Sequence, residues 1–481
     1  MKTKATDWKD PLVGRDEELR TLVEAGQSGR PEFIAVYGRR RVGKTFLVRK
    51  AFGNRFAFSH AGLARTGMRG QLAAFADSLS QSFGKPFDVP SSWLEAFSLL
   101  RKFLSAKRGR KILFLDEVPW MDTPCSRFLP ALEHFWNGWA SGEDDIVLVI
   151  CGSATSWIVR KIIDSYGGFH NRLTHRIRLR PFSLRGCREL LRAAGVSLTD
   201  RQIADLYMVF GGVPFYWSLL RKGESPAQAV DRLCFAEDGE LAGEFDRLYA
   251  SLFRRPEMHL AVIRALGTKK AGMTREELLS ATGIDNGGVF SKALVDLENC
   301  GFIRRYRFPG KVERDALWQL VDPFTLFHLR FLADGARKNR GEWLAGIASP
   351  VRFAWSGLAF EQLCLHHVPQ IKAALGIPGV ATDVYAARIP PGPDGEPGAQ
   401  IDLVLDRADG IVNLCEMKYS FDPFVVSPRY RSELLAKASA WQRAFGVRKA
   451  VHITLVTAAG LHPNENTDVV QSEVRLADLF A

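Results

Sequence analysis

The chain has 481 residues, of which 46% are hydrophobic and 25% are charged, a composition typical of a globular protein with three or four domains. No apolar run is long enough to cross a membrane, the opening residues MKTKATDWKD lack a signal-peptide core, and the seven cysteines form no C-x-x-C pair. We therefore expect a cytoplasmic protein without a membrane partner, structural zinc or disulfides. The net charge of +12 favours polyanionic partners, which include nucleotides and nucleic acids.

A glycine-rich segment, GRRRVGKT at residues 38–45, follows the apolar run FIAVY and precedes an amphipathic stretch. This order of strand, loop and helix predicts a phosphate-binding loop, because the glycines let backbone N–H groups surround a phosphate at the helix N-terminus. Lys44 is expected to reach the β- and γ-phosphates of ATP, and the hydroxyl of Thr45 to bind Mg²⁺. The predicted nucleotide-binding residues of this segment are Gly38, Arg39, Arg40, Arg41, Val42, Gly43, Lys44, Thr45 and Phe46.

A second apolar run, KILFLDEV at residues 111–118, ends in two carboxylates. Asp116 is expected to hold Mg²⁺, and Glu117 to orient and deprotonate the attacking water. Together with the phosphate-binding loop, this predicts ATP hydrolysis with Lys44 and Glu117 as catalytic residues. A third buried run, IVLVICGS, ends at Ser153, whose hydroxyl either senses the γ-phosphate or caps the next helix.

The predicted elements form an α/β multidomain protein with five parts. Residues 1–180 alternate buried strands with helices, which indicates a doubly wound parallel sheet. Residues 181–255 show helical periodicity and form a predicted lid, residues 256–325 a winged helix-turn-helix, and residues 326–349 a helical linker. Residues 350–481 form a second α/β domain.

The predicted winged helix combines an acidic third helix with a basic hairpin. An apolar stripe is expected on the third helix at Val289, Phe290, Ala293, Leu294 and Leu297. Its polar side sets Lys292 against Asp296 and Glu298, a charge that suits a DNA groove poorly. The hairpin turns at Pro309-Gly310 and carries Arg304, Arg305, Arg307, Lys311 and Arg314. The sequence is consistent with two roles for this hairpin: contact with DNA, or packing against another domain.

A second candidate site lies in IDLVLDRADGIVNLCEMKYS at residues 401–420. This segment is predicted to form the two strands of a hairpin. A three-residue loop from Ala408 to Gly410 would place Asp402 opposite Glu416, with Gly410 in the left-handed conformation. A two-residue turn would instead place Asp402 opposite Met417, on the wrong face of the sheet. We predict the three-residue loop.

With that register, Asp402, Glu416 and Lys418 share one face of the sheet. Two carboxylates can hold Mg²⁺, and the lysine can orient a nucleophile or stabilise developing charge. Glu361, in the helical stretch WSGLAFEQLCLHH, could add a third carboxylate. Asp402, Glu416 and Lys418 are therefore predicted catalytic residues, and Asp402, Glu416 and Glu361 predicted metal ligands. The alternative is an edge hairpin with solvated charges.

The N-terminal motifs resemble those of prokaryotic AAA+-like ATPases of the STAND superfamily, in the group related to archaeal ATPases. GRRRVGKT and FLDE are similar to the phosphate and magnesium motifs of this family. LVGRDEEL is similar to its adenine-side motif, which implies nucleotide contacts from Gly14 and Arg15. GGVP is similar to the lid signature, which implies that Pro214 packs near the base. Arg172, in a basic segment, is either a phosphate contact, such as an arginine finger, or a solvated arginine.

The C-terminal segment resembles a PD-(D/E)xK nuclease-like domain, both at AQIDLVLDRADGIVNLCEMKYS and at the ending VVQSEVRLADLF. The leading Pro-Asp of that superfamily is absent, because Gln400 and Ile401 precede Asp402.

The sequence thus predicts an ATP-binding and ATP-hydrolysing switch coupled to a metal-dependent nuclease-like effector, in defence against foreign DNA by analogy with the family. DNA rather than RNA is the expected nucleic acid, and a second copy of the chain is a further candidate partner. Two alternatives stay open. In one, the C-terminal domain is catalytically inactive and only binds DNA or protein; in the other, the chain is a regulator that reads DNA through its wing.

Overall fold

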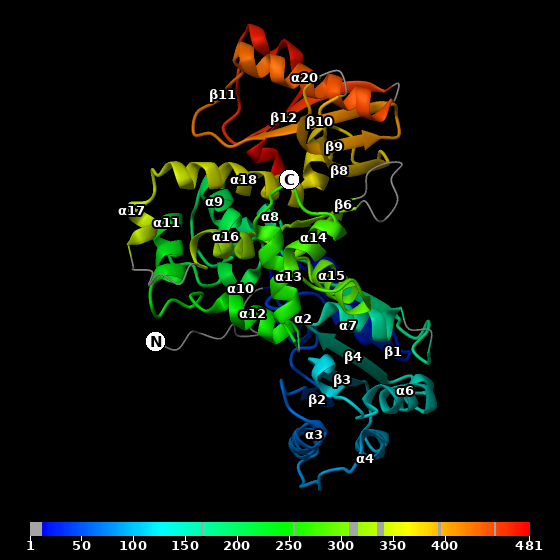
Figure 1. Ribbon diagram of the computed structural model, residues 1–481. Helices are drawn as coiled ribbons and strands as arrows, with labels where there is room; N and C mark the ends of the chain where they lie inside the picture. Colours follow the sequence, from blue (N-terminus) through cyan, green and yellow to red (C-terminus); the bar gives the residue numbers. More distant parts are fainter. Residues whose placement is uncertain are drawn as a thin grey trace. The chain divides into compact units, whose positions relative to one another are not determined.

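The computed structural model describes residues 12–164, 167–253, 255–306, 316–333, 341–392, 396–446 and 449–481 (Figure 1). The chain forms two compact units, Met1–Pro181 with Asp246–Pro256, and Phe182–Phe245 with Glu257–Ala481. Within the described ranges, no helix combines the length and the apolar character that a membrane crossing needs.

The first unit is built on a parallel sheet of β1 (Glu32–Tyr37), β2 (Phe58–Ala61), β3 (Lys111–Asp116), β4 (Ile146–Gly152) and β5 (His175–Arg178), in the order β2-β3-β4-β1-β5. Its helical elements are α1 (Asp16–Gln27), α2 (Lys44–Ala51), α3 (Met68–Phe83), α4 (Trp93–Ser105), α5 (Val118–Met121), α6 (Phe128–Gly138), η1 (Ala140–Gly142), α7 (Thr155–Ile158) and η2 (Val159–Ile163).

Alternate residues of β1 pack on opposite faces of this sheet. Phe33 and Ala35 join an apolar cluster with α3, α4 and α6, whereas Ile34 and Val36 join a second cluster with α1 and α2. A parallel sheet that is covered on both faces needs apolar strands throughout, which explains the uninterrupted apolar runs. The predicted parallel α/β core is confirmed.

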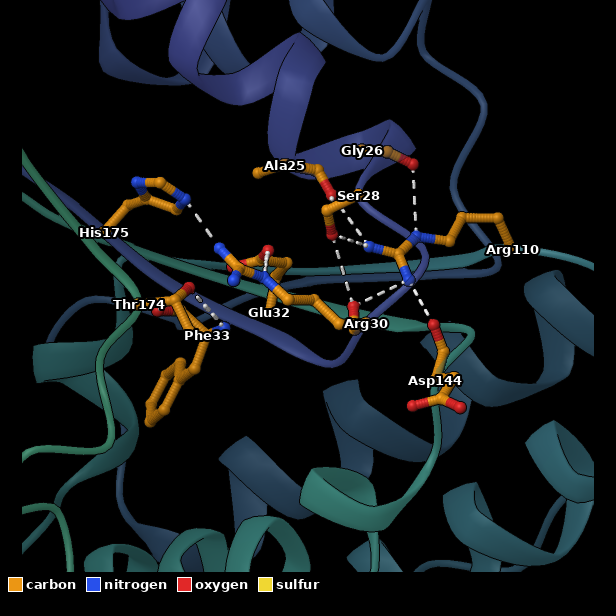
Figure 2. Close-up of polar contacts among 10 residues, drawn as sticks. All are labelled: Ala25, Gly26, Ser28, Arg30, Glu32, Phe33, Arg110, Asp144, Thr174 and His175. Atoms are coloured by element: carbon orange, nitrogen blue, oxygen red, sulfur yellow. Dashed lines mark hydrogen bonds and ion pairs between the residues drawn. The ribbon is translucent and has the colours of Figure 1, made fainter.

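A polar cluster lies at the end of the sheet where strand β1 begins (Figure 2). The carboxylate of Glu32 is fully buried, Arg30 donates to its Oε1 at 2.8 Å, and His175 Nε2 lies 3.6 Å from its Oε2. The guanidinium of Arg110 donates to the carbonyl oxygens of Ala25, Gly26, Arg30 and Asp144. Arg110 therefore ties the end of α1 to the loops that lead into β1 and β4.

We expect Glu32→Gln to destabilise the first unit. Burial alone would raise the pKa of Glu32, but hydrogen bonds from Arg30, Thr174 and Ser28 outweigh it, so the pKa is lowered from 4.5. A lowered pKa stabilises the fold above pH 4.5, and this contribution is lost as the pH falls through the folded-state value. Because the Arg30 side chain is 66% exposed, we expect a loss of only about 1–2 kcal/mol at pH 7.

Urea unfolding at pH 7 and at several values below pH 4.5 measures this effect. The variant should lose less stability on acidification than the wild type does. Equal acid sensitivity of the two proteins would contradict the assigned role of Glu32.

The second unit contains most of the remaining helices. They are α8 (Leu184–Ala193), α9 (Asp200–Phe210), α10 (Pro214–Trp217), α11 (Pro226–Val230), η3 (Asp231–Phe235), α13 (Glu257–Gly267), α14 (Arg275–Thr282), α15 (Gly288–Asn299), α16 (Pro323–Phe331), α17 (Glu342–Ala345), α18 (Pro350–His366), α19 (Val368–Ala374), α20 (Pro428–Phe445), η5 (Glu465–Val469) and η6 (Leu476–Phe480). Helix α12 (Glu244–Leu252) passes from the second unit into the first.

Helices α13 to α15 are followed by an antiparallel pair, β6 (Ile303–Tyr306) and β7 (Leu317–Leu320), in the element order expected for residues 256–325. Val289 is 69% exposed, so it does not belong to the buried stripe that the sequence predicted for α15. It lies in the first turn, whereas Phe290, Ala293, Leu294 and Leu297 face the core. The predicted hairpin residues Arg307, Pro309, Gly310, Lys311 and Arg314 lie outside the described residues.

The described part of this hairpin packs inside the second unit. Tyr306 joins an apolar cluster with Tyr385, Ile401 and Trp441, and Arg304 Nη2 donates to the carbonyl of Leu365 at 3.1 Å. Of the two roles left open for the hairpin, the contacts of β6 favour packing between domains.

The C-terminal sheet has the order β14-β12-β10-β9-β8. Its strands are β8 (Thr382–Ile389), β9 (Ala399–Arg407), β10 (Ile411–Lys418), β12 (Ala450–Thr457) and β14 (Ser472–Arg475), and a separate parallel pair is formed by β11 (Phe424–Val425) and β13 (Leu461–His462). Strands β8, β9 and β10 pair antiparallel, whereas β10, β12 and β14 pair parallel.

The hairpin between β9 and β10 has the predicted three-residue loop. Leu403 pairs with Cys415, so the same register sets Asp402 opposite Glu416. Gly410 has φ 85°, the left-handed conformation that the loop requires.

The boundaries of the two units differ from the five predicted parts. Residues 246–256 pack with the first unit, and residues 182–245 pack with the C-terminal segments. The guanidinium of Arg201 on α9 lies 3.8 Å from the ring centre of Tyr419 and donates to the carbonyl of Ser420. Arg188 on α8 lies over the ring of Phe480. Helices α8 and α9 are therefore bound to the C-terminal segments in one body.

Candidate functional site

The phosphate-binding loop has the backbone that its sequence predicts. Gly38 and Gly43 have φ of 148° and 91°, and helix α2 begins at Lys44. A Cβ atom at Gly38 would lie 2.2 Å from the carbonyl oxygen of Leu179, so the loop excludes any side chain there. Arg41 also adopts a left-handed conformation, with φ 69°. Arg39, Val42 and Lys44 are buried, whereas Arg40, Thr45 and Phe46 are half-buried.

Among the described residues, the ammonium group of Lys44 contacts only neutral oxygens. It donates to the carbonyls of Gly38 at 3.0 Å and Arg39 at 2.9 Å, and to Ser153 Oγ at 2.9 Å. Lys44 is 5% exposed, and within the described residues no carboxylate lies at ion-pair distance from it. A buried cation without a counter-ion is costly, so the arrangement calls for an anionic ligand.

Ser153 connects Lys44 with the predicted catalytic base. Its hydroxyl donates to Glu117 Oε1, and its backbone N–H donates to Glu117 Oε2 at 3.1 Å. The strand order explains this contact: β4 lies between β1 and β3, so its end lies between the loop after β1 and the carboxylates after β3. Ser153 does not cap α7, whose N-cap position is Ala154 without a side-chain cap.

The two predicted magnesium ligands of this site lie together. Thr45 Oγ1 donates to Asp116 Oδ2 at 2.7 Å, and the other oxygen of Asp116 accepts from the backbone N–H of Glu117 at 2.9 Å. Hydroxyl and carboxylate oxygens are the donors that Mg²⁺ prefers, so these residues fit the ion. Glu117 itself has φ 48°, a left-handed conformation that is uncommon outside glycine and that clusters at functional sites.

The other predicted nucleotide contacts are more scattered. Gly14 is left-handed (φ 60°), and Arg15 is buried, with its guanidinium donating to the carbonyl of Arg180. Arg172 is exposed in the turn before β5. Pro214 begins α10 in the second unit, and Val213 separates it from the pair Gly211 and Gly212.

Packing within the second unit explains why glycines precede Pro214. A Cβ atom at Gly212 would lie 1.8 Å from the carbonyl oxygen of Phe182, and Phe182 N donates to Gly212 O at 2.7 Å. Gly211 has φ 57°. The GGVP segment is thus required by close packing of two backbones.

Residues 12–220 match a family described as an ATPase domain predominantly from Archaea. An uncharacterized protein of Methanocaldococcus jannaschii is 22% identical over 67% of this chain and 69% of its own length. Among solved structures, the Walker-type ATPase of Pyrococcus abyssi shows 18% identity and a TM-score of 0.49, over 67% of this chain and 97% of that one. The ORC2 protein of Aeropyrum pernix, in ADPNP and ADP complexes, shows 14% identity and a TM-score of 0.42, over 66% and 93%.

The matched segment contains the phosphate-binding loop, the paired carboxylates and Ser153 in the geometry described above. Residues 12–220 therefore carry an ATPase domain of the P-loop class. The protein binds nucleotide and is an ATPase.

A second candidate site lies on the C-terminal sheet. Glu416 and Lys418 share a face, with Lys418 Nζ 3.9 Å from Glu416 Oε2. Asp402 Oδ2 accepts from the backbone N–H of Met417 at 3.3 Å. Glu361 approaches from α18, which packs against β10. Burial and then the charge of Asp402 raise the pKa of both Glu361, to about 7, and Glu416, so the three carboxylates are close enough to interact.

Protein cations already neutralise two of these carboxylates. Lys437 Nζ donates to Glu416 Oε1 and Lys270 Nζ to Glu361 Oε1, each at 2.6 Å. Across the described ranges, no group of three or more His, Cys, Asp or Glu side chains is arranged to hold a metal ion. The carboxylates have the oxygen donors that Mg²⁺ takes, but in this arrangement lysines take the place of an ion.

Sequence reasoning missed Lys437, Tyr430 and Lys270. Tyr430 and Lys437 could have been found, because Tyr430, Leu434, Lys437 and Trp441 recur at helical spacing and mark the face of α20 toward the sheet. Tyr430 Oη donates to Glu416 Oε2 at 3.3 Å. Lys270 carried no such signal, since only the tertiary fold brings it to Glu361.

Proposed function

We propose that the protein is an ATP-driven switch in which the first unit binds ATP and Mg²⁺ and the second unit responds as one body. The observation that carries the proposal is the buried ammonium of Lys44, which has no carboxylate partner among the described residues and faces neutral oxygens alone. A phosphate group would supply the missing negative charge. Thr45 and Asp116 would hold Mg²⁺, which neutralises charge on the β- and γ-phosphates.

Ser153 and Glu117 give the site a way to distinguish ATP from ADP. Ser153 accepts from Lys44 and donates to Glu117. A γ-phosphate would compete with Ser153 for the ammonium of Lys44, and this would change the hydrogen bonds of Glu117. Glu117 would then accept a proton from the attacking water.

The response of the second unit follows from its internal contacts. Because Arg201 and Arg188 fix α8 and α9 to the C-terminal segments, a displacement of the predicted lid would carry the acidic site with it. The contact of Pro214 with the base and an arginine finger at Arg172 remain part of this proposal. They are supported by resemblance to STAND ATPases alone.

We further propose that the C-terminal domain is nuclease-like and acts on DNA in a metal-dependent way. The register that sets Asp402 opposite Glu416, with Glu361 beside them, supports this. The pairing of Glu361 with Lys270 and of Glu416 with Lys437 supports the alternative, a catalytically inactive domain that binds DNA or protein. Defence against foreign DNA and self-association rest on the family resemblance.

One assay distinguishes the two proposed functions of the C-terminal domain, an active nuclease and an inactive binding domain. Purified protein is incubated with plasmid, single-stranded DNA and RNA, with Mg²⁺ or Mn²⁺, and with or without ATP. Cleavage that Asp402→Ala abolishes would support the nuclease. Binding of DNA without cleavage under any of these conditions would support the inactive domain.

We expect any binding to duplex DNA to be strongly salt-dependent and weakly sequence-specific. The acidic residues of α15 oppose phosphate, and Arg305 already lies 3.9 Å from Glu298. Titration of one duplex at several salt concentrations measures the slope, and a second duplex of different sequence measures specificity. Tight, salt-insensitive preference for one sequence would contradict this expectation.

A further inference from the structure

A cavity of about 270 Å³ lies inside the second unit, between α9, the end of α13, α16 and α18. Its walls are mostly apolar and include Met208, Leu266, Leu326 and Trp355. The volume is near the lower end for ligand pockets, which suits a molecule somewhat smaller than a drug. Neither the ATPase site nor the acidic site uses these apolar walls.

One buried polar group in the cavity has an unmet hydrogen bond. Gln362, on α18, lines the cavity and is 6% exposed. Its Oε1 accepts no hydrogen bond from any described residue. A buried acceptor left unpaired costs about 1–3 kcal/mol, so a native fold retains one mainly where a ligand or water pairs with it. Gln362 Oε1 is therefore expected to accept a hydrogen bond from a group inside the cavity.

Three cationic side chains line the same cavity. Lys269 and Lys270 are paired with Glu277 and Glu361, whereas Arg330 is exposed and has no ion-pair partner in the described part of the chain. An apolar interior with this one uncompensated charge favours a ligand that is apolar at one end and anionic at the other.

We propose that this cavity binds a small amphipathic anion. The apolar body would pack against Trp355 and its neighbours, an N–H or O–H of the ligand would donate to Gln362 Oε1, and the anionic group would face Arg330. The site is independent of the proposed ATP switch, because none of its lining residues is assigned to nucleotide; Lys270 alone among them also contacts the acidic site, through Glu361.

Two dyes with the same body test the proposal on the full chain. 1-Anilinonaphthalene-8-sulfonate has an aromatic body, an N–H and a sulfonate, and N-phenyl-1-naphthylamine lacks only the sulfonate. Both fluoresce more strongly in apolar surroundings, so saturable binding is measured by titration. Ala354→Phe places a ring at the cavity, since Ala354 lines it and is exposed. Ala373→Phe, at an exposed alanine of α19, is the matched control.

The expected pattern distinguishes each part of the site. Ala354→Phe should abolish saturable binding of both dyes, and Ala373→Phe should leave it unchanged. Gln362→Leu should weaken both dyes by about threefold to tenfold, because both donate an N–H. Arg330→Ala should weaken the sulfonate dye alone, by about twofold to fivefold. No saturable binding to the wild type, or equal binding in Ala354→Phe and the wild type, would overturn the proposal.

Discussion

Lys44→Ala should abolish ATP binding, and Glu117→Gln should bind ATP while hydrolysing it about a hundredfold or more slowly. The two residues act at different stages. The buried ammonium of Lys44 supplies charge to the bound phosphates, whereas Glu117 acts on the attacking water. Equilibrium binding of a fluorescent ATP analogue and a phosphate-release assay measure the two effects separately.

A third variant, Ser153→Ala, is compared with Lys44→Ala and Glu117→Gln. It removes the hydroxyl between Lys44 and Glu117 but neither charged group, so ATP binding should persist with a smaller loss of turnover than in Glu117→Gln. Circular dichroism excludes a folding defect in each variant. Turnover in Glu117→Gln equal to that of the wild type would contradict its assignment as the base.

Lys270→Met should strengthen binding of Mn²⁺ at the acidic site by about tenfold, because it removes a cation that lies 2.6 Å from Glu361. Lys269→Met is a matched control. It loses the same charge one residue away, from a pair with Glu277 that lies at 2.5 Å. Electron paramagnetic resonance of free Mn²⁺ gives the affinity, and Asp402→Ala defines the binding that belongs to other sites.

Three outcomes of this measurement are distinguishable. Tighter binding in Lys270→Met alone supports a metal site that Lys270 closes. Equal affinities in the two lysine variants contradict that role. Absence of any binding that Asp402→Ala removes would support the inactive C-terminal domain.

Local patterns predicted those parts of the protein that depend on neighbours in sequence. The loop from Gly38 to Thr45, the buried strands and the three-residue hairpin loop follow from turn chemistry and periodicity, and the structure has them. The role of Ser153 stayed open because it depends on strand order. Only the insertion of β4 between β1 and β3 places that hydroxyl between Lys44 and Glu117.

The acidic site was predictable in part. Alternation along the hairpin placed Glu416 and Lys418 on one face, and the loop length set Asp402 opposite. The pairing of Glu361 with a lysine could not be predicted from local sequence patterns, because Lys270 and Glu361 are 91 residues apart and meet only through tertiary packing. The grouping of the lid helices with the C-terminal segments was missed for the same reason. It depends on contacts such as that of Arg201 with Tyr419.

The switch is tested most directly by the distance between the two units in different nucleotide states. Spin labels at Gln81→Cys in the first unit and Ser439→Cys in the second, in a Cys125→Ser and Glu117→Gln background, leave the six buried cysteines unlabelled. Pulsed dipolar spectroscopy then compares the protein with ATP and Mg²⁺, with ADP, and without nucleotide. We predict that ATP shifts the distance distribution and that adding Lys44→Ala removes the shift. Identical distributions in all three states, with ATP binding shown in the same samples, would contradict the switch.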